Sequence, residues 1–257
     1  MSSAMRPEAP VTEDRVLGGR LLLRQPATGH RVGHDAILLA AAAPATTGRF
    51  ADFGAGVGSA GLAVLWRLNA AHATLVEIDP ALAALATENG AANGFAPRCD
   101  IVCADVLTLA RPGGPDFPAA ERFDLVLTNP PFNATGAHQT SPDAARARAH
   151  MAGAETLREW VTAAYRCLAP GGTLAMILRP EDLAMLLSAL EGRFGAARLL
   201  PVHANPTAPA VRLLVRAIKG RRTAPALLPG LILADADGMP TPRSTAILRD
   251  GAALEMG

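Results

Sequence analysis

The sequence predicts a single α/β domain with a seven-stranded, mostly parallel sheet, helices on both faces and an antiparallel last strand. Short aliphatic runs alternate with longer helical patterns, which is typical of strand–helix–strand units around a parallel sheet. A Pro-rich loop rather than a helix separates the last two runs, so these runs are expected to pair as an antiparallel hairpin. At 257 residues the chain is long enough to bury a sizeable core.

The expected elements follow from these patterns in chain order. The β-branched and aliphatic runs predict strands at 49–53, 73–78, 99–104, 123–128, 173–178, 197–202 and 211–218. The longer segments between them predict helices at 35–43, 59–69, 81–93, 156–169 and 180–194. Residues 1–14 are expected to form a flexible tail without the apolar core of a secretory signal, which leaves 15–257 as the domain. The polar segment 133–154 is expected to be a mobile insert.

The composition places the chain among globular proteins, because 50% of the residues are hydrophobic and 18% are charged. No apolar run reaches membrane-spanning length. The cysteines Cys99, Cys103 and Cys167 cannot all pair and lack zinc-site spacing, so we expect free thiols in a cytoplasmic protein. The histidines also lack metal-ligand spacing, and no metal site is expected.

A glycine-rich loop follows the first expected strand, where Asp52 precedes Gly54, Gly56 and Gly58. Glycines let the backbone turn sharply and let a ligand approach without a Cβ in the way. The G-x-G-x-G spacing differs from the G-x-G-x-x-G of dinucleotide folds, which argues against a pyrophosphate at the helix terminus. A plain tight turn would give the same pattern, so the interpretation depends on the motifs that follow.

Acidic residues follow the next two strands. Glu77 comes about 20 residues past the glycine loop, where an acid accepts hydrogen bonds from ribose hydroxyls in Rossmann-type sheets. Asp79 is the competing candidate, but Asp79-Pro80 has the form of a helix cap and first turn. Asp105 closes the third strand, where an acid can accept a hydrogen bond from a purine amino group. Helix capping alone would also explain Glu77 and Asp79, and Asp105 alone is a common strand-end residue.

The sharpest signal is Asn129-Pro130-Pro131-Phe132, directly after the fourth expected strand. The two prolines fix the backbone φ at about −65° and lack the N–H group, so the nearby carbonyls are rigid and free to accept hydrogen bonds. An amino nitrogen conjugated to a ring is a poor nucleophile, because its lone pair is delocalised. The Asn129 side-chain oxygen and the Pro130 carbonyl could hold its two hydrogens, which favours a pyramidal nitrogen and stabilises its growing charge. Phe132 offers a face for stacking a base; an ordinary turn with Phe132 in the core is the alternative.

In this order, the four signals resemble the class I S-adenosylmethionine-dependent methyltransferases, which have a Rossmann-like fold. They resemble in particular the subgroup whose Asn-Pro-Pro-(Phe/Tyr) motif marks transfer to a planar amino group. The resemblance covers about residues 21–222. More closely, the chain is similar to the tRNA adenine-N6 methyltransferases that modify the adenine beside the anticodon of a valine tRNA. This similarity rests on Gln-Pro at 25–26, Gly-His-Arg-Val-Gly-His-Asp-Ala-Ile-Leu-Leu at 29–39 and Arg-Leu-Leu-Val-Arg-Ala-Ile-Lys-Gly at 212–220.

The resemblance implies S-adenosylmethionine as the cofactor and no metal. It implies that Asn129, Pro130 and Phe132 act on the amino group of the substrate. Eight residues are implied to contact the cofactor: Asp35, Asp52, Gly54, Gly56, Gly58, Glu77, Asp105 and Val106. The family packs the segment around Asp35 over the methionine end of the cofactor, and a helix N-cap is an equally natural interpretation of this residue.

The implied partner is tRNA. The net charge of +1 gives no whole-protein attraction to nucleic acid, so RNA contacts would depend on local patches. Two groups of basic residues are candidates: Arg146 and Arg148 in the insert, and Arg212, Arg216, Lys219, Arg221 and Arg222 on and after the last strand. Because side chains alternate along a strand, Arg212 and Arg216 lie on one face of the expected strand 211–218. The insert is either an RNA-contacting lid or a solvated loop.

Three other functions stay open. A protein-glutamine methyltransferase also acts on a planar amide nitrogen, but that family usually has a helical N-terminal domain and a tyrosine in the motif. Here the glycine loop begins at Gly54 and the motif ends in Phe132. A non-catalytic, methyltransferase-like RNA-binding protein would have a degraded cofactor site. A small-molecule N-methyltransferase is the third, because nothing in the sequence reports the size of the acceptor.

Overall fold

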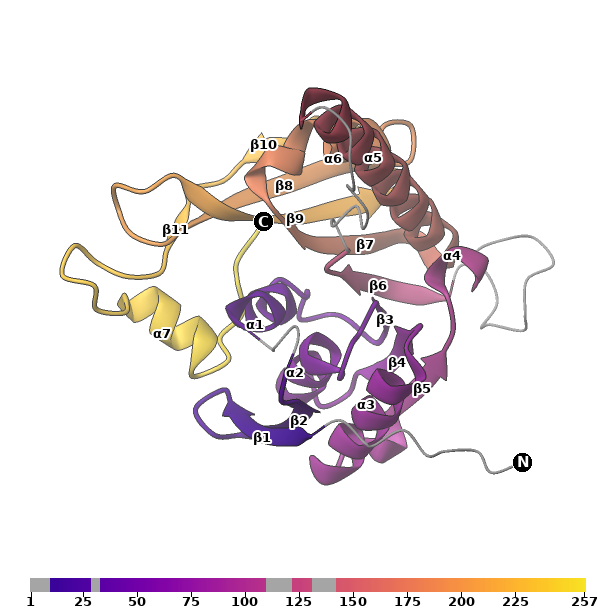
Figure 1. Cartoon of the computed structure of the whole chain (residues 1–257), viewed down its shortest axis with the longest axis vertical. Coiled ribbons are helices and arrows are strands. Elements are labelled where there is room, and N and C mark those ends of the chain that lie inside the picture. The colour runs from indigo at the N-terminus through magenta and orange to yellow at the C-terminus, as the bar shows by residue number, and fades with distance from the viewer. Residues whose placement is uncertain (1–9, 29–32, 110–121, 131–141) are drawn as a thin grey trace.

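A mostly parallel sheet runs through the whole molecule (Figure 1). The computed structural model describes residues 10–28, 33–109, 122–130 and 142–257, and for 142–152 the backbone alone. Along the sheet the seven main strands follow the order β5-β4-β3-β6-β7-β9-β8. Their bounds are β3 Arg49–Phe53, β4 His72–Glu77, β5 Cys99–Cys103, β6 Phe123–Thr128, β7 Leu168–Leu178, β8 Phe194–His203 and β9 Ala210–Lys219.

The last main strand, β9, pairs antiparallel with both β7 and β8, whereas the other main strands are parallel. The expected α/β class, with its antiparallel last strand, is confirmed. Two short strands, β10 (Ala226–Leu227) and β11 (Leu231–Ile232), extend the sheet by pairing with β8. Because β9 runs opposite to its neighbours, its first residues lie at the edge where the parallel strands end.

Helices cover both faces of the sheet (Figure 1). One face carries α1 (His34–Ala41), α2 (Ser59–Arg67), α3 (Pro80–Ala92) and α7 (Pro242–Leu248). The other carries α4 (Val106–Leu109), α5 (Pro142–Cys167) and α6 (Leu183–Leu190). Short 3-10 turns occur at Ala96–Arg98 and Pro180–Asp182. Among the described residues, no helix is long and apolar enough to cross a membrane.

The strands are buried on both faces, so their sequences are near-continuous apolar runs. Within β6, Leu125 and Leu127 belong to the core under α1 and α2, whereas Phe123 and Val126 belong to the core under α5 and α6. This alternation gives the sheet two separate hydrophobic layers. The three cysteines are unpaired, as the sequence predicts.

The N-terminal part of the domain differs from the sequence prediction. Residues 11–14, expected to belong to a flexible tail, lie in β1 (Val11–Val16), which pairs antiparallel with β2 (Leu21–Pro26). The polar side chains of β1 give no apolar run, and β1 is exposed or half-buried along its length. The hairpin forms because β2 buries Leu21 and Leu23 in the core. A local sequence pattern does not reveal this tertiary contact.

The second difference concerns the expected insert at 133–154. Its first part, up to residue 141, lies outside the described residues, but its second part is helical, because α5 begins at Pro142 rather than near residue 156. The added turns are rich in alanine and arginine, which favour a helix even without an apolar stripe. At the other end, β7 begins at Leu168, five residues before the expected start at Thr173.

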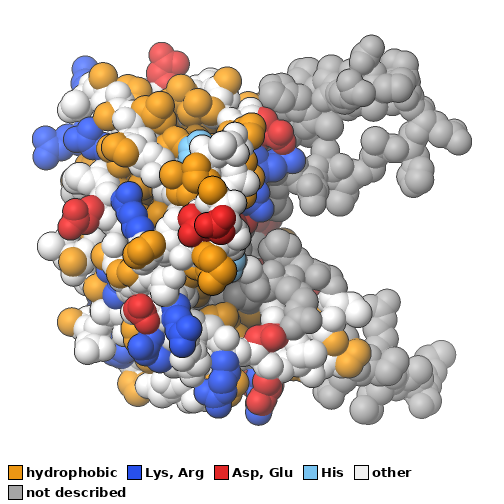
Figure 2. Space-filling view, turned by 90° about the vertical axis from the view of Figure 1, so that its left-hand side faces the viewer, with side chains coloured by type: hydrophobic (Ala, Val, Ile, Leu, Met, Phe, Trp, Pro, Cys, Tyr) orange, Lys and Arg blue, Asp and Glu red, His pale blue; other side chains and the backbone are white. Residues whose placement is uncertain are grey.

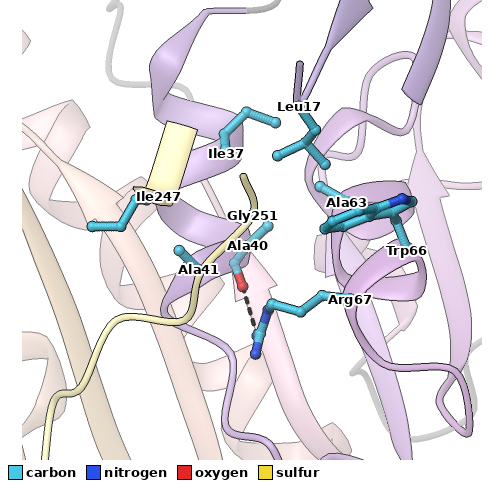
Figure 3. Close-up of a pocket in the computed structure, with 9 residues that line it drawn as sticks. All are labelled: Leu17, Ile37, Ala40, Ala41, Ala63, Trp66, Arg67, Ile247 and Gly251. Atoms are coloured by element: carbon cyan, nitrogen blue, oxygen red, sulfur yellow. Dashed lines mark hydrogen bonds between the residues drawn. The ribbon is translucent and has the colours of Figure 1, made fainter. Parts of the chain in front are cut away.

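The hairpin, α1, α2 and α7 line a small, partly open pocket of about 10 Å³, barely enough for one water molecule (Figure 3). Most of its lining is apolar, with the Trp66 ring on one side and Ile247 on the other. Arg67 donates from Nη2 to the carbonyls of Ala40 at 3.0 Å and Ala43 at 2.6 Å. A cation at these carbonyls stabilises the C-terminal end of α1.

Asp52 is a buried acid in β3 that fixes the start of the following helix. Its Oδ2 accepts the backbone N–H of Gly61 at 2.8 Å, which ties α2 to the strand. Burial raises the pKa of the Asp52 carboxyl to about 7; the Gly61 hydrogen bond acts in the opposite direction, and the nearby Glu77 carboxylate adds to the rise. Because the pKa is higher in the folded than in the unfolded chain, this group stabilises the fold at low pH, and the stabilisation is lost as the pH rises.

We expect Asp52→Asn to remove this pH dependence. In the native protein the contribution of the Asp52 carboxyl to the unfolding free energy is complete below about pH 4 and is lost above about pH 7. The unfolding free energy of the variant, relative to the native protein, should therefore grow by on the order of 3 kcal/mol between about pH 4.5 and 7.5. Denaturant unfolding at several pH values measures this difference. Asp100→Asn, at an exposed position of β5, is the control; parallel profiles for Asp52→Asn and the native protein would contradict the shifted pKa.

Lys219 closes β9 as a buried cation, with 7% of its surface exposed. Its Nζ donates to the Leu168 carbonyl at 2.6 Å and lies 4.6 Å from the centroid of the Tyr165 ring. These contacts join the end of β9 to the junction of α5 and β7. Lys219 therefore has a structural role in the sheet.

We expect Lys219→Met to lower the unfolding free energy by about 2 kcal/mol, because the Leu168 carbonyl loses a charged donor while the side-chain length is retained. Arg221→Met, two residues later at an exposed position, should change it by less than about 0.5 kcal/mol. Denaturant unfolding of both variants provides the measurement. Equal stabilities of the two variants would show that the buried contacts of Lys219 do not stabilise the fold.

Candidate active site

Four neighbouring strands bring the predicted site residues to one edge of the sheet. The strands β6, β3, β4 and β5 lie side by side and parallel, with Thr128 opposite Phe53, Phe53 opposite Val76 and Glu77 opposite Cys103. Neighbouring strands are about 4.8 Å apart, so the ends of β6 and β5 are separated by about 14 Å. Asn129, the glycine loop, Glu77 and Asp105 thus follow one another along a line, which suits an elongated ligand.

The glycine loop between β3 and α2 needs its glycines for two reasons. Gly54 has φ +69°, and a Cβ on it would lie 2.8 Å from the ring of Trp160 on α5. Gly56 has φ +57°, and a Cβ there would point into open space. The first glycine permits close packing against the protein, and the second leaves room for a ligand against the backbone. Gly58, also at positive φ, is the N-cap of α2.

Glu77 is buried and uses both carboxylate oxygens to shape the site. Its Oε2 accepts the N–H of Gly56 at 2.8 Å, and its Oε1 accepts the N–H of Asp79 at 2.9 Å. Asp79 caps α3 by accepting the N–H of Ala81 at 2.8 Å, as the sequence predicts. Each Glu77 oxygen has a second lone pair, so Glu77 could bind ligand hydroxyls while it holds the loop.

Asp105 and Val106 follow β5 at the far end of the line. Asp105 is half-buried and accepts the N–H of Leu107 at 2.9 Å through Oδ1, so it caps the short helix α4. The side chain of Val106 is buried in the core beneath α5. Asp105 can therefore present its other oxygen to a ligand, whereas Val106 has only backbone groups to offer.

Asn129 lies at the opposite end of the line, and its side chain is exposed. Within the described part of the chain, no other group forms a hydrogen bond with this side chain. Pro130 is buried beside it. The preceding residue, Thr128, donates its hydroxyl to the Phe53 carbonyl at 3.1 Å, which fixes the end of β6 against β3. Pro131 and Phe132 lie outside the described residues.

Asp35 lies in the first turn of α1, and its partner is far away in the sequence. The N-cap of α1 is Gly33, so the interpretation of Asp35 as the N-cap is wrong. Its Oδ2 accepts a hydrogen bond from Nε of Arg212 on β9 at 2.7 Å. This ion pair ties the start of α1 to the start of β9, at the same edge of the sheet as Asn129.

Sequence reasoning missed two contributors to the site. Ile78 follows Glu77 directly, and 64% of its surface is exposed. It provides an apolar surface between the acids, suited to a flat ring. Trp160 supports the glycine loop from α5. The sequence patterns predict a strand at Ile78 and a helix at Trp160, and neither residue forms part of a recognisable motif.

The basic residues of the last strand do not form one patch. Arg212 and Lys219 are seven residues apart, or about 23 Å along a strand. Arg212 is paired with Asp35, and Lys219 is buried. Arg216 is half-buried and lines a cleft of about 330 Å³ beside Asp124 and Gly171, at the edge where β6 and β7 begin. The expected RNA-binding cluster is thus divided between opposite edges of the sheet.

The remaining basic candidates are Arg221 and Arg222, which are exposed beyond the end of β9, and Arg146 and Arg148, on the part of α5 whose side chains are not described. On the face that carries α7, basic and acidic side chains are mixed with apolar ones (Figure 2). The described side chains on that face form no extended surface of one charge.

Several proteins of known name are similar to this chain. The tRNA1(Val) (adenine(37)-N6)-methyltransferase of Porphyromonas gingivalis is 33% identical over 190 residues, which cover 72% of this chain and 72% of that protein. The protein of the same name from Aeromonas hydrophila is 34% identical over 150 residues, covering 58% of this chain and 59% of the relative. The crystal structure of a predicted O-methyltransferase from Agrobacterium tumefaciens is 29% identical, with a TM-score of 0.70, and the match covers 86% of this chain and 98% of that chain.

The match to a known family spans most of the site. Residues 31–203 match the family described as the methyltransferase small domain. This range contains the glycine loop, both strand-end acids and Asn129. The chain therefore belongs to the methyltransferase small domain family, and with it to the class I S-adenosylmethionine-dependent methyltransferases.

Proposed function

We propose that this enzyme transfers a methyl group from S-adenosylmethionine to the exocyclic N6 amine of an adenine in tRNA, in the cytoplasm. The observation that carries the proposal is the exposed side chain of Asn129, held at the end of β6 beside the glycine loop. The names of the relatives from Porphyromonas gingivalis and Aeromonas hydrophila support the choice of substrate.

The described residues fit the cofactor along the line from β5 to β6. In this proposal Asp105 accepts from the adenine amino group, Ile78 contacts the ring and Glu77 accepts from the ribose hydroxyls; the free lone pairs of the two carboxylates and the exposure of Ile78 support these roles. The open space at Gly56 leaves room beside the backbone. Asp52 supports the loop from beneath through Gly61. S-adenosylmethionine, when bound, supplies a methyl group activated by a positively charged sulfur.

Asn129 and Pro130 act on the acceptor. A conjugated amino group offers two hydrogens, and two rigid oxygen acceptors can hold both of them while the nitrogen becomes pyramidal. The Asn129 side-chain oxygen and the Pro130 carbonyl are the two acceptors, and they stabilise the positive charge that grows on nitrogen. In this role they need no prior deprotonation of the acceptor, because the proton leaves to water after transfer. Phe132 is the proposed stacking surface for the base.

A hydroxyl acceptor is the alternative, because the similar protein from Agrobacterium tumefaciens is named a predicted O-methyltransferase. A hydroxyl offers only one hydrogen, so it would leave one of the two acceptors unpaired. The amine therefore matches the site better. Purified tRNA, a release-factor protein and small phenols, each incubated with tritiated cofactor, separate the nucleic-acid, protein-amide and hydroxyl acceptors.

We expect Asn129→Ala to bind S-adenosylhomocysteine as the native protein does but to methylate tRNA about 100-fold more slowly or worse, because one acceptor of the amino group is lost. Asn129→Asp keeps an oxygen acceptor at this position, now as part of a carboxylate, and should retain more activity than the alanine variant. Calorimetry measures the binding, and tritium transfer with nucleoside mass spectrometry measures the turnover and the product. Native turnover by Asn129→Ala would refute the role of this side chain.

We expect Glu77→Gln to weaken cofactor binding by about tenfold or more, because a charged acceptor of the ribose hydroxyls and of the Gly56 N–H becomes neutral. Asp79→Asn, two residues later, is the matched control, because Asp79 caps α3 and should influence stability rather than affinity. Calorimetric titration with S-adenosylhomocysteine compares the two. If both variants bind as the native protein does, Glu77 does not contribute to the cofactor site.

A further inference from the structure

Two asparagines on α3 hold the N-terminal hairpin. Asn89 and Asn93 are four residues apart, so they lie on one face of the helix. Asn93 accepts the N–H of Leu22 at 2.9 Å and donates to the Leu22 carbonyl at 2.7 Å. Asn89 accepts the N–H of Arg24 at 2.7 Å and donates to the Arg24 carbonyl at 2.9 Å. The two side-chain amides thus pair with alternate residues of β2, as the edge of a neighbouring strand would.

Asn89 makes one contact that Asn93 does not. Its side-chain amide also donates to the carbonyl of Val57 at 3.0 Å, within the glycine loop. Asn89 is fully buried, and its two amide hydrogens are both used. One side chain therefore connects the backbone of the hairpin to the backbone of the cofactor loop.

Glu77 and Asn89 hold the loop from two different elements, β4 and α3. Glu77 holds the N–H of Gly56, and Asn89 holds the carbonyl of Val57, so the peptide group before Gly56 and the peptide group after Val57 are each restrained by a buried side chain. The N–H of the peptide group after Val57 belongs to Gly58 and donates to the Ala55 carbonyl at 2.8 Å, so Asn89 acts on the carbonyl end of a peptide group whose other end is held within the loop. A buried amide donor selects the orientation in which the Val57 carbonyl points toward α3.

We propose that Asn89 is a positioning residue that couples the docking of the N-terminal hairpin to the shape of the cofactor loop. In this arrangement the hairpin acts on the cofactor loop through the Asn89 side chain. The inference requires only that the loop binds the cofactor, so it is independent of which acceptor is methylated. Its test therefore measures cofactor affinity and amide exchange rather than methyl transfer.

The decisive comparison is Asn89→Ala against Asn93→Ala. Both variants lose two hydrogen bonds to β2, so both should melt at lower temperature than the native protein. Asn89→Ala also releases the Val57 carbonyl, so its Kd for S-adenosylhomocysteine should rise about tenfold, while that of Asn93→Ala should stay within about twofold of the native value. Calorimetry well below both melting temperatures gives the two affinities. Equal affinities for the two variants would overturn the proposal.

A second measurement uses the native protein, in case the alanine variants do not fold. If the hairpin and the loop are coupled through Asn89, saturating S-adenosylhomocysteine should slow hydrogen exchange at the amide of Arg24 several-fold. Exchange at Leu228, next to β10 at the far edge of the sheet, should not change; its N–H donates to the Leu199 carbonyl at 2.8 Å, and it serves as the internal reference. Unchanged exchange at Arg24 in the saturated protein would contradict the coupling.

Discussion

The structure depends on holding one loop, the glycine turn after β3, in a conformation that ordinary residues rarely adopt. Three buried polar side chains do this from three directions: Asp52 through the first turn of α2, Glu77 from the neighbouring strand and Asn89 from α3. Each replaces water at a backbone group that would otherwise be buried without a partner. The loop is thereby rigid before a ligand arrives, and binding does not have to supply the free energy of ordering it.

The parallel sheet makes this loop useful by placing other groups beside it. Strands that run in the same direction end at the same edge, so Glu77, Asp105 and Asn129 reach one line without long connecting loops. Their spacing is set by the distance between strands, which side-chain substitutions hardly change. In the proposed function the chemistry at each position depends on a single residue type: a carboxylate at Glu77 and Asp105 for cofactor hydroxyls and an amine, and an amide followed by proline at Asn129 for the reacting amino group.

Much of this arrangement follows from the sequence, because the determinants are local. The order of strands and helices, the glycine turn, the cap at Asp79 and the exposed Asn129 all depend on short patterns of apolar residues, glycine and proline. The N-terminal hairpin could not be predicted in the same way, because β1 is polar and the hairpin is held by asparagines about 70 residues away. The burial of Lys219 was missed because its partners, Leu168 and Tyr165, come from another strand and a helix.

The distribution of charge constrains how a tRNA could approach. The net charge is +1, Lys219 is committed to the sheet, and Arg212 at the active-site edge is neutralised by Asp35. Long-range attraction to a polyanion is therefore weak, and the active-site edge cannot depend on this arginine for a phosphate unless the ion pair opens. Selectivity would then come from short-range contacts at the reacting base, where two fixed acceptors distinguish an amino group from a hydroxyl. Such contacts act only after the base has entered the site, so the positions of the contacting groups must be fixed in advance. The rigidity of the surrounding loop and strand ends therefore matters for the reaction as well as for the fold.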